Sequence, residues 1–432
     1  MTYLPVEVVE VRAWADRVGA VALDPASGYY VFEYAPTWQA RGIELAPTTM
    51  PLSRQRHVFP TLPADTFHRL PAMLADALPD AFGNALTTAS LAAEGVSATA
   101  ITPLDRLAYL ASRGVGALEF RPARGPRPRR STAIDLAELV LTARSAVSGT
   151  FSSKDGITES LRRLIAVGTS AGGARAKAVV AWNPATGEVR SGQLPADPGF
   201  EQWLLKLDGV GADLDLGESA DFGRVEYAYA LMAEAAGIEM TACRLVPESG
   251  RAHFMTRRFD RLDDGTKVHT QSLCALAQLD FRLIGAHDYA QLFAITKRLG
   301  LGPEADAQVF RRMVFNVAAA NCDDHTRNFS FLLPQGGAWR LAPAYDVTHA
   351  HNPQSHWTAQ HLMAVNGRTR DISRSDVATV GDRFQVPDAT AIIGSVLDAV
   401  DSWSEFATKA SVGSTATAEV GRDILEMSAL LR

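Results

Sequence analysis

Residues 321–328 read NCDDHTRN, and a short distance downstream residues 344–347 read AYDV. Phosphoryl transfer needs a carboxylate that receives the proton of the attacking hydroxyl, and oxygen ligands for the Mg²⁺ that bridges the phosphates. Asp323 could be that base, and Asn328 and Asp346 could be the ligands. Asp and Asn also favour turns and helix ends, so these two runs alone do not separate chemistry from a simple turn. The interpretation therefore depends on motifs elsewhere in the chain.

The composition is that of an ordinary globular protein with two or three domains: 432 residues, 47% hydrophobic and 21% charged. A net charge of -6 argues against a protein that coats nucleic acid by itself. The three cysteines, Cys243, Cys274 and Cys322, form no C-x-x-C pair, which argues against a disulfide framework or a cysteine zinc site. The N-terminus lacks the pattern of a signal peptide, and no apolar run is long enough for a membrane helix. We expect a cytoplasmic protein with no membrane partner.

The first half of the chain combines strands, helices and a linker. Short alternating stretches predict a β-rich unit up to about residue 60, and apolar residues at helical spacing predict a helix over 65–78. Thr102 and Pro103 are typical of a helix start. The run RPARGPRPRR at 121–130 is rich in proline and arginine, which favours an exposed linker. An arm that binds nucleic acid is the alternative, because clustered arginines neutralise phosphates.

The remaining pattern predicts a β-containing region followed by a helical one, which is an α+β layout. Strands are expected at 177–182, 187–190, 203–207 and 253–259, and helices around 136–140 and at 225–236, 289–299, 303–320, 389–406 and 419–431. We divide the chain into an N-terminal subdomain (1–120), a linker and helix (121–150), a nucleotide-binding region (151–260) and a helical catalytic lobe (261–432).

A glycine-rich run, GTSAGGAR, occupies residues 168–175 between a helix end and a strand. Small residues allow backbone N–H groups to approach phosphate oxygens. The run is not a Walker motif, because Ala174 stands where a lysine should follow Gly173. Taken alone, the run favours a flexible turn over a phosphate-binding loop.

Lys206 lies within an apolar strand, between Leu205 and Leu207. Burying a lysine is costly unless it is paired, so Lys206 either emerges at a sheet edge or meets an anionic phosphate. Glu226, on the following helix, could orient Lys206 as the corresponding glutamate does in protein kinases.

Four histidines follow Asp346, and they raise the question of a metal site because imidazole is a common zinc ligand. They are His349, His351, His356 and His361. The segment lacks a recognised pattern such as H-E-x-x-H, so solvated loop histidines are the favoured interpretation. Neither a G-x-S-x-G elbow nor a G-x-G-x-x-G fingerprint follows a strand, which removes support for a serine hydrolase and for a dinucleotide fold.

The order of these motifs is more informative than any one of them. A glycine-rich loop, a strand lysine, a strand that ends in RRFD at 257–260, the 321–328 run and Asp346 follow one another as the parts of a kinase do. The chain resembles the HipA family of bacterial serine/threonine kinases, the toxin half of a toxin–antitoxin pair. The resemblance is carried by LPDAFG at 78–83, VGAL at 115–118, SAGGARAK at 170–177, LLKL at 204–207, RFDR at 258–261, NCDDHTRN at 321–328 and PAYD at 343–346.

The resemblance implies an α+β, two-lobed protein-kinase-like fold with an extra N-terminal β-rich subdomain and an all-helical C-terminal lobe. It implies that Asp323 is the catalytic base and that Asn328 and Asp346 hold Mg²⁺. Ser170 matches the serine that family members autophosphorylate, which lowers activity because the added phosphate repels ATP. The implied ATP-binding residues are Gly172, Gly173, Ala174, Lys177, Lys206, Arg257, Arg258, Phe259, His325, Asn328, Tyr345 and Asp346.

Two positions depart from the family pattern. Arg327 stands where lysine is frequent, which keeps the charge but changes the geometry of phosphate contact. Arg257 replaces an acidic residue of some relatives, which is harmless if only its backbone meets the adenine.

The resemblance implies an ATP- and Mg²⁺-dependent serine/threonine protein kinase that arrests growth. The expected partners are a HipB-like helix-turn-helix antitoxin, operator DNA reached through that antitoxin, and a protein substrate, for which an aminoacyl-tRNA synthetase is one class. Two other functions stay open: a phosphotransferase for small molecules, and a non-catalytic co-repressor scaffold that has kept the fold.

Overall fold

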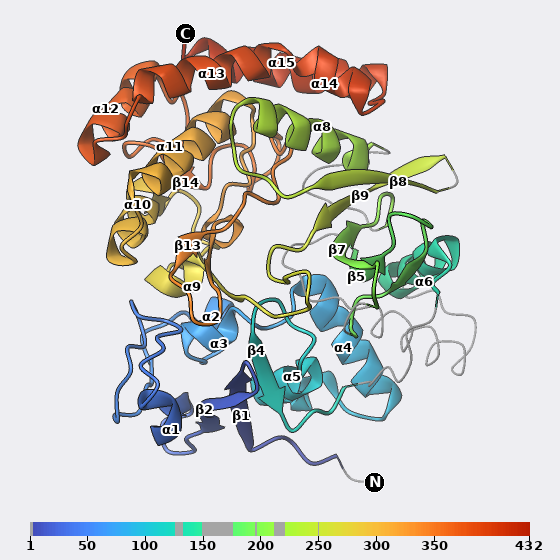
Figure 1. The fold of residues 1–432 in the computed structure, drawn as a ribbon, viewed down its shortest axis with the longest axis vertical. Coiled ribbons are helices and arrows are strands. Elements are labelled where there is room, and N and C mark those ends of the chain that lie inside the picture. Colours follow the sequence, from blue (N-terminus) through green and yellow to red (C-terminus); the bar gives the residue numbers. More distant parts are fainter. Residues whose placement is uncertain (1–2, 126–132, 149–175, 195–196, 211–220, 249) are drawn as a thin grey trace. The chain divides into compact units, whose positions relative to one another are not determined.

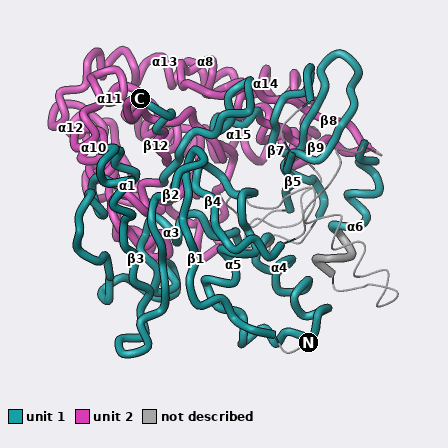
Figure 2. The backbone as a smooth tube through the Cα atoms, turned by 60° about the horizontal axis from the view of Figure 1, so that its bottom comes forward, with its two compact units in different colours: residues 1–211, 257–271, 333–337 teal, residues 212–256, 272–332, 338–432 magenta. Residues whose placement is uncertain are grey.

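The computed structural model describes residues 3–125, 133–148, 176–194, 197–210, 221–248 and 250–432. They form two compact units, each described by itself below and distinguished by colour in Figure 2. Unit 1 comprises residues 1–211, 257–271 and 333–337, and unit 2 comprises 212–256, 272–332 and 338–432. Both units combine distant parts of the sequence, so the four domain boundaries expected from the sequence stay a prediction.

Unit 1 begins with a four-stranded antiparallel sheet in the order β3-β2-β1-β4 (Figure 1). The strands are β1 (Val8–Ala13), β2 (Asp16–Leu23), β3 (Tyr30–Tyr34) and β4 (Leu118–Arg121). Alternate residues of β1 are buried, because successive side chains of a strand point to opposite faces of its sheet. The β-rich N-terminal unit is therefore confirmed, with its fourth strand contributed from much later in the chain.

The helices of unit 1 are short. They are α1 (Pro36–Gln39), α2 (Ala64–Phe67), α3 (Ala72–Ala75), α4 (Ala81–Ala93), α5 (Pro103–Leu110) and α6 (Leu136–Ser148). The predicted continuous helix over 65–78 is wrong: His68 and Arg69 adopt left-handed φ values of 53° and 61°, ahead of Pro71. A proline disfavours helical geometry in the residue before it. The start at Thr102 is confirmed, since Thr102 and Asp105 form a reciprocal capping box.

A second antiparallel sheet of unit 1 contains β5 (Lys177–Trp182), β6 (Val189–Ser191) and β7 (Glu201–Lys206), with β5 between the other two. The predicted hairpin is confirmed by the pairing of Trp182 with Val189. Within unit 1, the N–H of Arg258 also donates to Gln202 O on β7 at 2.9 Å.

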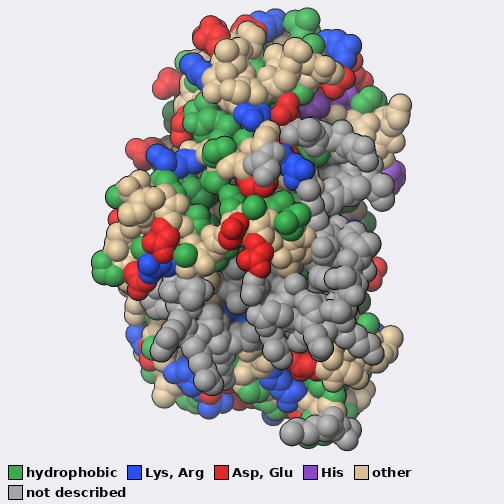
Figure 3. Space-filling view, turned by 90° about the vertical axis from the view of Figure 1, so that its right-hand side faces the viewer, with side chains coloured by type: hydrophobic (Ala, Val, Ile, Leu, Met, Phe, Trp, Pro, Cys, Tyr) green, Lys and Arg blue, Asp and Glu red, His purple; other side chains and the backbone are tan. Residues whose placement is uncertain are grey.

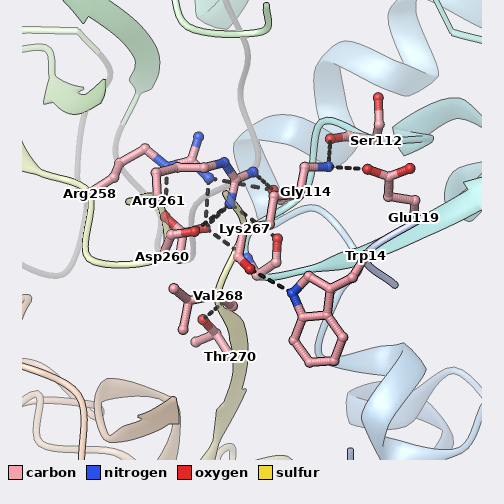
Figure 4. A network of polar contacts seen from close by, with 11 residues as sticks. Trp14, Ser112, Gly114, Glu119, Arg258, Asp260, Arg261, Lys267, Val268 and Thr270 are labelled. Atoms are coloured by element: carbon pink, nitrogen blue, oxygen red, sulfur yellow. Dashed lines mark hydrogen bonds and ion pairs between the residues drawn. The ribbon is translucent and has the colours of Figure 1, made fainter. Parts of the chain in front are cut away.

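Two sequence motifs of unit 1 meet at Asp260 (Figure 4). Its carboxylate accepts the N–H of Gly116 at 2.7 Å and hydrogen bonds from Arg258 and Arg261 at 2.7–2.8 Å. Burial tends to raise the pKa of Asp260, but the two guanidinium groups outweigh it and hold that pKa well below its usual range. Gly116 has φ +79°, and an added Cβ would lie 3.0 Å from the backbone N of Thr270, so glycine is required there.

Unit 2 is mainly helical (Figure 1). Its helices are α8 (Phe222–Ala235), α9 (Leu273–Ala277), α10 (Tyr289–Arg298), α11 (Pro303–Ala318), α12 (Arg374–Phe384), α13 (Ala389–Asp401), α14 (Trp403–Lys409) and α15 (Ser414–Ala429). They enclose one apolar core that includes Phe293, Phe310 and Phe315. The helix expected over 389–406 is divided at Ser402 into α13 and α14.

Short strands accompany these helices, so the C-terminal part of the chain is not purely helical. They are β8 (Cys243–Glu248), β9 (Arg251–Arg257), β10 (His269–Ser272), β11 (His287–Asp288), β12 (Ser330–Leu333), β13 (Arg340–Leu341) and β14 (Met363–Ala364). The α+β class is confirmed, and the short strands β10 to β14 lie inside the lobe at 261–432 that was expected to be all-helical.

Basic and acidic side chains are interspersed over the described residues visible in Figure 3, which agrees with the balanced composition. Within the described ranges, no helix combines the length and apolar character needed to cross a membrane. Cys243, Cys274 and Cys322 are all free thiols, as the sequence indicated.

Candidate active site

The 321–328 run follows α11, a helix of unit 2 whose second half is deeply buried. Most residues of α11 from Val309 to Ala318 are inaccessible to solvent, which fixes the end of the helix in the core. The chain leaves it through Ala320, whose φ is +51°, and the N–H of Asn321 returns to Asn316 O at 3.0 Å. A rigid helix followed by a tight turn therefore sets the position of Asp323.

The side chain of Asp323 is partly exposed, at 36%. Its Oδ1 accepts a hydrogen bond of 2.8 Å from the indole Nε1 of Trp357. His325 Nε2 lies 3.8 Å from the same oxygen. One oxygen of the proposed base is thus held by protein groups, and the side chain remains accessible to a substrate.

The orientation of His325 follows from its backbone partner. Its Nδ1 accepts the N–H of Arg327 at 3.2 Å, which caps the short 3-10 helix η2 (Thr326–Asn328). In the neutral ring the proton is therefore assigned to Nε2, the nitrogen that faces Asp323. The ring is enclosed by Phe281 and Trp357, with ring centroids 5.4 and 6.2 Å away.

The surroundings raise the pKa of Asp323 above its ordinary value. Loss of hydration is the main cause, while His325 and the hydrogen bond from Trp357 oppose it, and the negative charges of Asp346 and Asp324 add to it. Two residues of the predicted site, Asp323 and Asp346, are therefore close enough for the charge of Asp346 to raise the pKa of Asp323. A carboxylate with a raised pKa is also a stronger proton acceptor, which suits general base catalysis.

Asp324 is buried, at 1% exposed, whereas the side chain of the adjacent Asp323 is partly exposed. Its Oδ2 accepts from the Tyr289 hydroxyl at 2.8 Å and lies 3.1 Å from His361 Nδ1, while its Oδ1 accepts the N–H of Leu362 at 2.8 Å. Both oxygens are occupied by protein donors, so Asp324 is unavailable for substrate.

The network around Asp324 reaches back to α11. The Tyr289 hydroxyl accepts from Asn316 Nδ2 at 2.9 Å, and Asn316 Oδ1 accepts from Asn321 Nδ2 at 2.9 Å. These residues are buried, and their hydrogen bonds connect α11 to Asp324, although Asn321 Oδ1 has no hydrogen-bond partner among the described residues. The network positions the segment that carries Asp323.

Asp324→Asn is expected to destabilise the chain by about 1–3 kcal/mol, because one acceptor oxygen becomes an amide donor that faces other donors. Urea unfolding of the full chain measures the difference. Asp371→Asn is the control, since Asp371 is exposed and its replacement should change stability by less than about 0.5 kcal/mol. Equal unfolding free energies for Asp324→Asn and the unsubstituted chain would contradict the role assigned to the network.

Asn328 and Asp346 have the chemistry of Mg²⁺ ligands. Asn328 donates its Nδ2 to Asp323 O at 2.7 Å, which leaves the amide oxygen for a cation. Asp346 has φ +53°, a left-handed conformation that Asp and Asn tolerate better than most residues. Among the described residues no group of three or more His, Cys, Asp or Glu could hold a metal. Mg²⁺ usually takes one or two protein carboxylates and completes its shell with phosphates and water, so these two residues fit it.

Within unit 2, Tyr345 links the AYDV run at 344–347 to the 321–328 run by hydrogen bonds. Its hydroxyl donates to Arg327 O at 2.7 Å and lies 2.5 Å from Ser330 Oγ. The tyrosine therefore joins the segment of Asp346 to the end of the 321–328 run. The ATP-binding role of Tyr345 stays a prediction.

Lys206 and Lys177 stand directly opposite each other in unit 1, on β7 and β5. Like charges in such a pair are destabilising unless anions compensate them. Lys177 is 3% exposed, and its Nζ lies 3.4 Å from Oδ2 of Asp80, the N-cap of α4. Lys177 is the first residue of the strand predicted at 177–182, and its ATP-binding role stays a prediction.

The segment Arg257–Phe259 of unit 1 has its arginine side chains engaged. Arg257 Nη2 donates to Asp263 at 2.6 Å, and Arg258 binds Asp260 through two hydrogen bonds. The N–H of Arg258 is used by Gln202 O. Recognition of the adenine by the backbone of this segment stays a prediction.

The roles of the other predicted site residues stay predictions. Ser170, Gly172, Gly173 and Ala174 lie outside the described residues, as do residues 126–130 of the arginine-rich run. Unit 1 holds Lys177, Lys206 and Arg257–Phe259, and unit 2 holds Asp323, His325, Asn328, Tyr345 and Asp346. The pairing of Lys206 with Glu226 also stays a prediction, because the two residues belong to different units.

The histidines after Asp346 are mostly not solvated, so that interpretation is wrong for three of the four. His361 is 2% exposed beside Asp324. His349 Nε2 and His351 Nδ1 lie 2.8 and 3.2 Å from Oδ2 of Asp423 on α15. His356 is exposed as expected. Asp423 follows these histidines by many residues in sequence, so no local pattern could have indicated the pairing.

Residues that sequence reasoning missed also hold the site in place. Tyr289 and Asn316 look like core residues of amphipathic helices, and their polar roles arise from contacts with Asp324 and Asn321. Trp357 lies in a loop without a recognised motif. Its position soon after the AYDV run was the one available signal.

Comparison with known families gives two matches. A model described as the HipA-like C-terminal domain matches residues 169–404, and a model described as the HipA N-terminal domain matches residues 9–121. A Sinorhizobium fredii protein named "Putative kinase Y4mE" is 25% identical over 191 residues. The match covers 42% of this chain and 39% of that protein, so the chain spans about two fifths of its curated relative.

Two solved structures resemble the fold. HipA of Shewanella oneidensis MR-1, from a complex with HipB and operator DNA, matches with a TM-score of 0.65 at 14% identity. That match covers 98% of this chain and 96% of the other. The Helicobacter pylori proinflammatory kinase CtkA matches with a TM-score of 0.40 at 13% identity, over 60% of this chain and 90% of its own.

Proposed function

Because the chain belongs to the HipA family, we propose that it is an ATP- and Mg²⁺-dependent serine/threonine protein kinase of a toxin–antitoxin system. The observation that carries this proposal is the environment of Asp323. It is an accessible carboxylate with a raised pKa, oriented by Trp357 and within electrostatic reach of Asp346. A general base beside a magnesium ligand is the arrangement that protein phosphorylation requires.

In the proposed reaction Asp323 receives the proton of a serine or threonine hydroxyl as the oxygen attacks the γ-phosphate. Asn328 and Asp346 would hold Mg²⁺, which neutralises the charge on the phosphates when bound. Asp324 takes no part in the chemistry and keeps the catalytic run in place.

Incubation of the full chain with labelled ATP and Mg²⁺ tests this function. We expect label on protein, including Ser170 of the chain itself, and mass spectrometry locates the modified residue. Label that appears only on added small molecules would favour the phosphotransferase alternative. ATP turnover at the background level would favour a co-repressor scaffold, although a scaffold has no need of Asp323, Asn328, Lys206 and Asp346 together.

Asp346→Asn is expected to weaken Mg²⁺-dependent nucleotide binding by about 10-fold or more, since even changes next to metal ligands have effects of that size. Calorimetric titration with a non-hydrolysable ATP analogue, with and without Mg²⁺, measures it. Asp371→Asn is a matched control, because Asp371 has a similar left-handed φ of 48° and lies outside the proposed site. Unchanged Mg²⁺-dependent affinity in Asp346→Asn would reject its role as a ligand.

The partners are part of the same proposal. The Shewanella oneidensis protein was solved with HipB and operator DNA, which supports a helix-turn-helix antitoxin for this chain and DNA contact through it. The substrate is proposed to be a cellular protein, with an aminoacyl-tRNA synthetase as one class, and the location to be cytoplasmic. Whether the neighbouring open reading frame encodes a helix-turn-helix protein is the most direct check on the antitoxin.

A further inference from the structure

Among the described residues, hydrogen-bond donors approach only one of the two carboxylate oxygens of Asp323. The indole N–H of Trp357 and the Nε2 of His325 both approach Oδ1, at 2.8 and 3.8 Å. An indole nitrogen can only donate, so the direction of the first hydrogen bond is fixed. Within the described part of the chain, Oδ2 has no hydrogen-bond partner. The two oxygens of the proposed base are therefore not equivalent.

The loop that carries Trp357 is held in place by hydrogen bonds between its own residues. Ser355 Oγ accepts the N–H groups of Trp357 and Thr358 at 3.0 and 3.2 Å, and the N–H of Asn352 donates to Thr358 O at 3.3 Å. Ser355 and Thr358 are 7% and 2% exposed. The backbone that carries the indole is therefore held in a closed, hydrogen-bonded turn.

The same loop is anchored a second time by Asp324. This residue holds His361 and the N–H of Leu362, which follow Trp357 closely in sequence. Asp323 and Asp324 are adjacent, and both bind the 357–362 segment, one at each end. The distance between Trp357 and the catalytic run is consequently fixed by two attachments.

Aromatic packing restricts the indole further. Phe281 meets Trp357 edge to face, with ring centroids 6.5 Å apart and planes at 81°, and His325 meets it at 6.2 Å and 63°. Such geometries are favourable for aromatic pairs. The ring therefore has little freedom to leave Asp323.

From these contacts we propose that Trp357 is a positioning residue for the phosphoryl transfer: its indole N–H holds Oδ1 of Asp323, so that Oδ2 faces the acceptor hydroxyl and receives its proton. This inference rests on the proposed kinase function and assigns a direction to the base. A carboxylate without this hydrogen bond would rotate about its Cβ–Cγ bond and present the reacting oxygen for a smaller part of the time.

Trp357→Phe tests the inference, because phenylalanine keeps the aromatic packing and removes the N–H. We expect kcat to fall about 10- to 100-fold, the usual effect of displacing a reacting group by about 1 Å, with the KM for ATP unchanged. Trp403→Phe is the matched control. Trp403 donates to Thr417 O at 3.0 Å in the core of the same unit, so its variant loses an equivalent hydrogen bond and should keep the kcat of the unsubstituted chain.

A double-mutant cycle separates positioning from general structural damage. If Trp357 acts only through Asp323, Trp357→Phe should cause no further loss of single-turnover transfer in an Asp323→Asn background. A further 10-fold loss in that background would overturn the proposal, and so would an unchanged kcat in the single variant. Absence of any transfer by the unsubstituted chain would instead reject the kinase function itself.

Discussion

Asp323→Asn lowers the rate of phosphoryl transfer about 10²- to 10⁴-fold, the range expected for loss of a positioned general base. The amide is almost isosteric with the carboxylate, and its oxygen can still accept the 2.8 Å hydrogen bond from Trp357. The side chain should therefore keep its place and lose only its basicity. Single-turnover autophosphorylation with labelled ATP provides the rate.

Nucleotide affinity is the internal control for this substitution. Asp323 is not a proposed magnesium ligand, so calorimetry should show ATP binding by Asp323→Asn within a few-fold of the unsubstituted chain. Autophosphorylation at the unsubstituted rate would show that another group receives the proton. A loss of both transfer and binding would place Asp323 among the metal ligands instead.

Asp260→Ala destabilises the full chain by about 3–5 kcal/mol, because removing one partner of a buried ion pair leaves the other charge unpaired. Here two guanidinium groups would be left, since Arg258 and Arg261 are 6% and 10% exposed in their side chains (Figure 4). The N–H of Gly116 would lose its acceptor as well. Denaturant unfolding of the full chain measures the difference.

Asp263→Ala is the matched control, three residues away. Asp263 also pairs with an arginine, Arg257, at 2.6 Å, but its side chain is 88% exposed. Solvent screening reduces such a pair to about 0–1 kcal/mol. If the two alanine variants unfolded at the same denaturant concentration, the buried network would have no special contribution to stability.

The stability contributed by Asp260 also depends on pH. Its folded pKa is lowered by Arg258 and Arg261, while the unfolded value is about 3.9. A group with a lowered folded pKa stabilises the protein above its unfolded pKa and loses that contribution as pH falls towards the folded value. The difference between the unsubstituted chain and Asp260→Ala should therefore be constant at neutral pH and decrease below about pH 4.

Local signals in the sequence were sufficient where the physics is local. The capping box at Thr102 and the hairpin of β5 and β6 depend on neighbouring residues, and both predictions are confirmed. The prediction of a continuous helix over 65–78 was wrong because it relied on the spacing of apolar residues and neglected Pro71. A proline disfavours helical geometry in the residue before it, and the chain leaves the helix at His68 and Arg69. The family and the α+β class are confirmed as well, because the order of several motifs limits a chain more than any one motif.

The roles of side chains in the site depended on long-range contacts. Adjacent aspartates at 323 and 324 are indistinguishable in sequence, yet one is accessible and the other is 1% exposed within a polar network. His349 and His351 were assigned to solvent because Asp423, their partner, comes from the distant helix α15. Neither distinction could be derived from spacing.

The sequence by itself determined the family, the fold class and the inventory of groups suited to phosphoryl transfer, because these depend on which residue types occur and in what order. Only the tertiary structure decided which carboxylate is accessible, which is buried, and that Trp357 holds one oxygen of Asp323. The physical reason is that burial and hydrogen bonding join residues distant in sequence, and these two effects set the orientation and pKa of a carboxylate.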